Sequence, residues 1–67
     1  MRISQEKLEI AMATVGFNFI DLAEASGVSR VSLSYINSGK SCKPQTGGKI
    51  AKALNVPVTE LIEQEAR

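Results

Sequence analysis

The segment from residue 18 to 38 constrains the fold of this chain most, because it reads as two short helices on either side of one glycine. Asn18 is a good N-cap for the first of these helices, and Gly27 follows its last residue. Glycine adopts the left-handed backbone conformation at a helix end at little cost, whereas most other residues do not. Ser29 then caps the second helix, which ends at Ser38-Gly39. The segment therefore predicts two helices joined by a tight turn.

Capping and stop residues predict three more helices, so the expected fold class is an all-α, compact five-helix domain without strands. Ser4 caps the first helix and Gly16 ends it. Thr46 is the expected N-cap of the fourth helix, which begins with two glycines and stops at Asn55. Val56-Pro57 opens the fifth helix. The apolar stripe of that fifth helix comprises Val58, Leu61 and Ile62.

Length and composition exclude several classes of protein. The 67 residues form one domain, residues 1–67, with a tail at 63–67 that we expect to fray. The sequence has no membrane-spanning apolar run and no signal-peptide pattern, which predicts a cytoplasmic protein without a membrane partner. A single cysteine, Cys42, excludes an internal disulfide framework, and the lack of histidine argues against a metal site. No cofactor is expected, and no catalytic constellation supports an enzyme.

Cys42 itself lies in the loop between the third and fourth predicted helices. A redox-sensing thiol needs a resolving partner, and the chain has no second cysteine. We therefore interpret Cys42 as an incidental loop cysteine.

The net charge of +1 is unevenly distributed along the chain. Between Ser29 and Lys52 there are five basic residues and no acidic one, while the segments before and after are acidic on balance. A basic block in an otherwise balanced protein is typical of a surface that faces phosphate groups. The alternative is a solvated run of lysines, and Lys49 and Lys52 fit either interpretation. The position of the block, directly after the predicted turn, favours the phosphate-facing surface.

The helical period predicts which side of the helix after the turn faces outward. Val28, Leu33 and Ile36 are expected to point into the core. Arginine at the start of an outward helix face suits a bidentate contact with guanine, and valine suits a contact with the methyl group of thymine. A tyrosine there serves equally well as a packing residue whose hydroxyl meets a phosphate. The outward side comprises Ser29, Arg30, Val31, Ser34 and Tyr35.

Three groups of residues follow one another along the chain at a characteristic spacing. They are Leu22-Ala23 with Gly27-Val28-Ser29, then Leu33-Ser34-Tyr35-Ile36 with Gly39-Lys40, and then residues 49–56 with Leu61. Together they resemble the Cro/cI-type (XRE-like) helix-turn-helix domain of phage repressor-like regulators over residues 4–63. The resemblance implies a lambda-repressor-like fold whose recognition helix, residues 29–38, enters the major groove of DNA.

The resemblance also implies roles for individual residues. Base contacts fall on Arg30, Val31 and Tyr35, with Ser34 on the same face. Phosphate contacts fall on Ser29, Phe19, Lys40, Ser41, Lys43 and Gln45, joined by Thr46 and Gly47 because the first N–H groups of a helix suit an anion. Phe19 departs from the family, which commonly has glutamine there. A second departure is the pair Met12 and Asn37, where many relatives carry a paired arginine and glutamate.

The expected function is sequence-specific binding of double-stranded DNA by a transcriptional regulator, acting as a repressor in a bacterial or phage setting. The expected partners are a palindromic operator and a second copy of the chain, because one 67-residue chain contacts few base pairs. Val58 and Ile62 are the predicted dimer surface. The alternative is a protein-interaction module or antitoxin-like protein that keeps the fold and binds an unidentified protein partner, motivated by the adjacent Phe19-Ile20.

Overall fold

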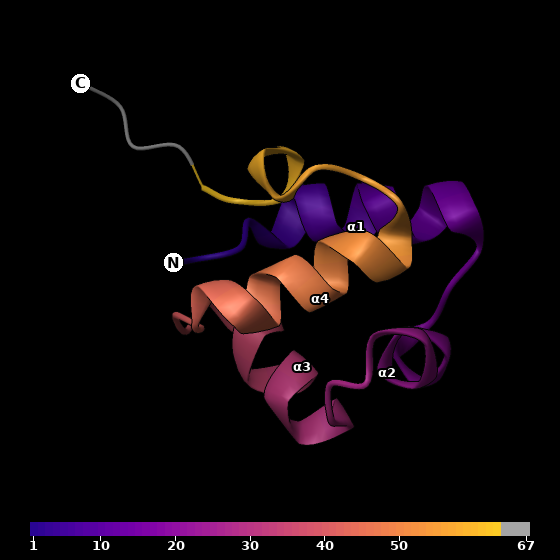
Figure 1. The fold of residues 1–67 in the computed structure, drawn as a ribbon, viewed down its shortest axis with the longest axis horizontal. Coiled ribbons are helices and arrows are strands. Elements are labelled where there is room, and N and C mark those ends of the chain that lie inside the picture. The colour runs from indigo at the N-terminus through magenta and orange to yellow at the C-terminus, as the bar shows by residue number, and fades with distance from the viewer. Residues whose placement is uncertain (64–67) are drawn as a thin grey trace.

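Residues 1–63 are described by the computed structural model, in which four α-helices and one short 3-10 helix surround a single core (Figure 1). In chain order the elements are α1 (Gln5–Val15), α2 (Phe19–Ser26), α3 (Arg30–Asn37), α4 (Pro44–Leu54) and η1 (Val58–Glu60). The all-α class is confirmed: within residues 1–63 the extended backbone forms only an isolated antiparallel bridge between Ile3 and Ile62. No helix in this range is long and apolar enough to cross a membrane.

The first three helices begin and end at the predicted capping residues. The Ser4 hydroxyl accepts a hydrogen bond from the Lys7 N–H at 3.3 Å. Asn18 and Asp21 form a reciprocal capping box, with donor-to-acceptor distances of 2.8 and 3.1 Å. Gly27 ends α2 with a φ of 75°, in the left-handed region. The turn between α2 and α3 therefore needs the glycine that the sequence supplies.

Helix α4 lies at the centre of the fold and packs against α1, α2 and η1 (Figure 1). Its inner face contributes Ile50, Ala51 and Leu54 to the core. Val28 is buried in the corner between α2 and α3, as predicted. The other large side chains that are fully buried are Ile3, Leu8, Leu22, Leu33 and Leu61. The buried core includes side chains from all four α-helices, and Val58 of η1 is partly buried against it.

The predicted fifth α-helix is wrong, because Val58–Glu60 form only a single 3-10 turn. Beyond that turn the backbone pairs with the start of the chain. The Ser4 N–H donates to the Leu61 carbonyl at 2.7 Å, and the Glu63 N–H donates to the Arg2 carbonyl at 2.9 Å. These bonds use backbone groups that a continuing helix would need for itself. Within residues 1–63, η1 is therefore the last helical segment.

The dimer surface predicted at Val58 and Ile62 loses its geometric basis with that helix. Val58 is half-buried against the core, and Ile62 is half-buried and forms the backbone bridge with Ile3. The two side chains do not lie on one free helical stripe. Of the tail predicted to fray, only Glu63 lies within the described residues, and residues 64–67 lie outside them.

Helix α4 starts at Pro44 with Lys43 as its N-cap, so the prediction that Thr46 caps this helix is wrong. Proline suits the first turn because it has no N–H group to leave unpaired. Gly47 consequently lies inside the helix, and a Cβ built on it would be 2.5 Å from the Met1 Sδ atom. The close approach of Met1, and not a loose helix start, accounts for glycine at this position.

Gly48→Ala should raise the free energy of unfolding by about 1 kcal/mol, because Gly48 is helical and has open space where a Cβ would lie. Gly47→Ala is the matched control one residue away. It makes the same change in helix propensity but displaces the Met1 side chain, so its gain should be smaller or negative. Urea unfolding followed by circular dichroism measures both values. Equal gains would show that Met1 does not occupy the space over Gly47.

Candidate nucleic-acid interface

Helix α3 presents the predicted outward face to solvent. Leu33 is fully buried and Ile36 is nearly so, which anchors the opposite side of the helix in the core. Val31 is 65% exposed and Tyr35 is 56% exposed. Arg30 and Ser34 are exposed beside them. Tyr35 is therefore exposed enough to contact another molecule.

The exposed face of α3 stands between two shallow grooves. The first groove is lined by Asn18, Phe19 and Ile20 at the start of α2 and by Arg30, Val31 and Ser34 of α3. The second lies between α3 and the chain that follows it, with Ser32, Tyr35, Ile36, Ser41, Cys42, Lys43 and Thr46 as its lining. The structure thus gathers all four predicted base-contacting residues along one protruding helix. Such a helix has the shape that the roughly 12 Å wide major groove of B-DNA admits.

The loop after α3 is held in place by backbone hydrogen bonds. The Lys40 N–H donates to the Tyr35 carbonyl at 3.2 Å, which ties the loop to the end of α3. The Cys42 N–H donates to the Met1 carbonyl at 2.7 Å, which ties it to the start of the chain. The exposed side chains of this loop are Lys40, Ser41 and Lys43. Two lysines are therefore positioned beside α3 on a braced backbone.

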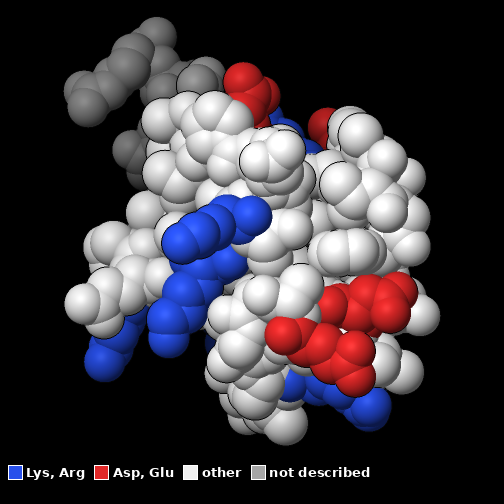
Figure 2. All heavy atoms as spheres, turned by 45° about the vertical axis from the view of Figure 1, so that its right-hand side comes forward, with Lys and Arg blue, Asp and Glu red and all other residues white. Residues whose placement is uncertain are grey.

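Within residues 1–63, the basic residues of the acid-free stretch form no ion pair with a carboxylate. Arg30, Lys40, Lys43, Lys49 and Lys52 are all exposed. Figure 2 shows basic side chains mainly on the left and at the bottom of the face in view, and acidic side chains at its right and top. Within residues 1–63 the one ion pair joins Arg2 and Glu63 instead. Uncompensated surface cations attract phosphate groups and release counterions when they bind them.

Gly47 lacks the open N–H group on which its predicted phosphate contact was based. Gly47 is buried, and its N–H donates to the Lys43 carbonyl at 3.1 Å, because α4 starts three residues before it. The N–H groups in the first turn that the helix itself does not use belong to Gln45 and Thr46, since Pro44 has none. The anion-binding end of α4 is thus moved toward the lysines of the loop.

Phe19 occupies the first position of α2, with its ring half-buried against the core. A phenyl ring has no hydrogen-bond donor, so any phosphate contact at this position falls to the backbone N–H. The next residue, Ile20, is 51% exposed and lines the same groove as Val31. Of the adjacent pair, Ile20 is therefore the residue available to a partner.

Neither Met12 nor Asn37, the two positions where many relatives carry a charged pair, is fully exposed. Met12 is buried in the core and Asn37 is half-buried. The Asn37 Oδ1 atom is the one buried side-chain oxygen or nitrogen within residues 1–63 that has no hydrogen-bond partner. An unpartnered buried acceptor costs stability. Because neither Met12 nor Asn37 is charged, these two positions cannot form the ion pair that many relatives have.

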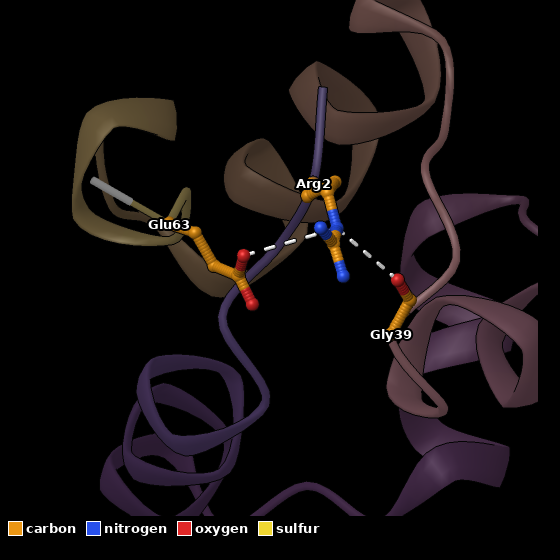
Figure 3. Close-up of polar contacts among 3 residues, drawn as sticks. All are labelled: Arg2, Gly39 and Glu63. Carbon is orange, nitrogen blue, oxygen red and sulfur yellow. Dashed lines mark hydrogen bonds and ion pairs between the residues drawn. The ribbon is translucent and has the colours of Figure 1, made fainter. Parts of the chain in front are cut away.

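Arg2 is a charged residue near the candidate interface whose position there could not be predicted from the sequence. The Arg2 Nε atom donates to the Gly39 carbonyl at 3.3 Å and lies 3.8 Å from the Glu63 carboxylate (Figure 3). Arg2 precedes the first helix, and its two partners lie at the end of α3 and beyond η1. Sequence reasoning from local periodicity and caps cannot join such distant segments.

Comparison with known proteins gives one result. A family model described as helix-turn-helix matches residues 20–61, which is more than half of the chain and spans nearly all of α2 together with α3, α4 and η1. No curated protein and no solved structure matches the chain significantly.

Proposed function

Because the chain belongs to the Cro/cI-type helix-turn-helix family, whose domains are DNA-binding and regulatory, we propose that it is a sequence-specific transcriptional repressor. In this proposal α3 enters the major groove, with Arg30, Val31, Ser34 and Tyr35 at the base edges. The observation that supports it most is the exposure of these four side chains along one helix, next to lysines that have no carboxylate partner in the described part of the chain. The protein would act on DNA in a bacterial or phage-infected cytoplasm.

The phosphate contacts in this proposal flank α3 on both sides. Ser29 at its N-cap and the Phe19 N–H at the start of α2 would meet one strand of the duplex. The loop and the first turn of α4 would meet the other strand, through Lys40, Ser41, Lys43, Gln45 and Thr46. Such contacts set the register of the helix on the duplex, while the base edges supply the sequence preference.

We further propose that the chain binds a palindromic operator as a homodimer. A single α3 reaches few base pairs, and two-fold symmetric pairs of such helices read half-sites about 34–36 Å apart. The proposal relies on this geometry of DNA, since Val58 and Ile62 do not form the expected surface. In-vitro selection of bound duplexes from a random pool tests the function directly. An enriched motif with two inverted half-sites one helical turn apart is expected, and a pool without enrichment would contradict sequence-specific binding.

Arg30→Ala should weaken binding to the selected duplex by about 1–3 kcal/mol and relax the preference at one base pair. Arg30→Lys is the matched control, because it keeps the charge but loses the bidentate fork that recognises guanine. Both variants should lose affinity for the selected duplex, whereas only Arg30→Ala should lose affinity for random DNA. Fluorescence anisotropy with both duplexes measures the difference. Unchanged affinity of Arg30→Ala for the selected duplex would remove Arg30 from the base contacts.

Lys40→Ala should weaken binding to all sequences alike and reduce the slope of log K against log salt concentration by about one. The reason is that a phosphate contact releases one condensed counterion but reads no base. A titration series between low and physiological salt measures the slope for each protein. A slope equal to that of the unsubstituted chain would place Lys40 outside the interface.

A second candidate function, a protein-interaction module or antitoxin-like partner, has one observation in its favour. Ile20 and Val31 expose apolar surface in the same groove, where a partner protein could bury it. The selection experiment separates the two candidates. Salt-dependent binding with an enriched motif supports the repressor. A folded protein that shows neither salt-dependent binding nor an enriched motif supports the protein-binding module.

A further inference from the structure

The first residues of the chain join two segments that lie far apart in the sequence. Ile3 pairs with Ile62 through the backbone, and the Glu63 N–H donates to the Arg2 carbonyl at 2.9 Å. On the other side the Cys42 N–H donates to the Met1 carbonyl. The start of the chain thus lies between the segment after η1 and the loop after α3, and Arg2 is located at this junction (Figure 3).

Only one nitrogen of the Arg2 side chain, Nε, has a polar partner within residues 1–63. Its Nε atom donates to the Gly39 carbonyl at 3.3 Å and lies 3.8 Å from the Glu63 Oε1 atom. The side chain is 61% exposed, and no hydrogen bond from its two terminal nitrogens occurs within residues 1–63. An arginine has five N–H donors in a rigid fork that matches the oxygens of a phosphate. The four donors on the terminal nitrogens therefore have no hydrogen-bond partner in the described part of the chain.

The neighbourhood of this fork is the part of the protein where phosphate contacts are proposed. Gly39 directly precedes Lys40, and the same loop carries Lys43. The hydrogen bond to the Gly39 carbonyl holds the guanidinium at the edge of the loop. Arg2 therefore extends the row of basic groups beyond the acid-free stretch in which the sequence concentrates them.

We propose that Arg2 is a further phosphate-binding residue of the DNA interface, and that Glu63 weakens this contact by competing with the phosphate for the guanidinium. The inference rests on the proposed function. Glu63 is 45% exposed, and its separation of 3.8 Å from Arg2 is that of a loose surface pair. Such pairs are weak, so a phosphate displaces the carboxylate, but the displacement lowers the net affinity. Glu63 therefore lowers the affinity for phosphate groups whatever the DNA sequence.

Glu63→Gln tests the competition without removing any phosphate-binding group. It should tighten binding to selected and random duplexes alike, about two- to five-fold at low salt. Glu60→Gln is the matched control, because it makes the same change in net charge on η1 without a contact to Arg2. A gain from Glu63→Gln that clearly exceeds that from Glu60→Gln supports the proposal. Equal gains would mean that only overall charge matters and would overturn it.

Arg2→Ala tests the phosphate contact itself. It should reduce the salt slope by about one and abolish the effect of a second Glu63→Gln substitution in the same chain. Circular dichroism melting of each variant verifies that it folds, and the gain expected of Glu63→Gln cannot arise from misfolding. If Lys40→Ala lowers the slope but Arg2→Ala does not, the inference on Arg2 fails while the proposed function stands. If the unsubstituted chain shows no salt-dependent DNA binding, the proposed function fails with it.

Discussion

Complete burial of Leu33 in α3, with Ile36 beside it, is the constraint on which the rest of the candidate interface depends. The preceding helix buries Leu22 completely, and the Gly27 turn leaves only three residues between the two helices. With one side of α3 anchored in this way, the period of 3.6 residues places Val31 and Tyr35 on the opposite side, with Ser34 beside them and Arg30 at the edge of that face. The outward face is thus a consequence of core packing, and no contact with DNA is needed to produce it.

The local features of this fold could be predicted from the sequence because they depend on residues close together in the chain. Ser4, Asn18 and Ser29 cap their helices through groups three residues away, and Gly27 ends α2 through its own backbone freedom. The features that could not be predicted depend on distant segments. The fifth helix is replaced by a 3-10 turn because the backbone after it pairs with residues 2–4. Periodicity within a window carries no information about that pairing.

The same division applies to the candidate site. The outward residues of α3 follow from its period and the charge of the loop follows from composition, so both were accessible from the sequence. The predicted start of α4 is wrong because capping propensity favours Thr46 over Lys43. In the structure the helix begins earlier, with Pro44 at its first position, where proline is favoured. Gly47, predicted as an open anion contact, lies instead under the Met1 side chain. Arg2 reaches the loop only through the folded chain.

The exposed face of α3 and the basic loop after it form one surface of the molecule. The exposed residues of α3 supply chemistry suited to base edges, and the lysines after it supply charge without carboxylate partners in the described residues. The helix-turn-helix family is a DNA-binding family, and this surface is the one that we propose for the contact. The opposite side, formed by α1 and η1, carries the exposed acids Glu6, Glu9 and Glu60, which would repel a duplex.

Backbone amide chemical shifts, recorded while a short duplex of random sequence is added at low salt, test this assignment of the DNA-facing surface most directly. Non-specific binding is strongest under these conditions and needs no knowledge of the operator. We expect the largest changes between residues 29 and 46, with the outer face of α1 unaffected. Changes concentrated on α1, or no changes at any DNA concentration, would show that α3 and its loop do not form a DNA-binding surface.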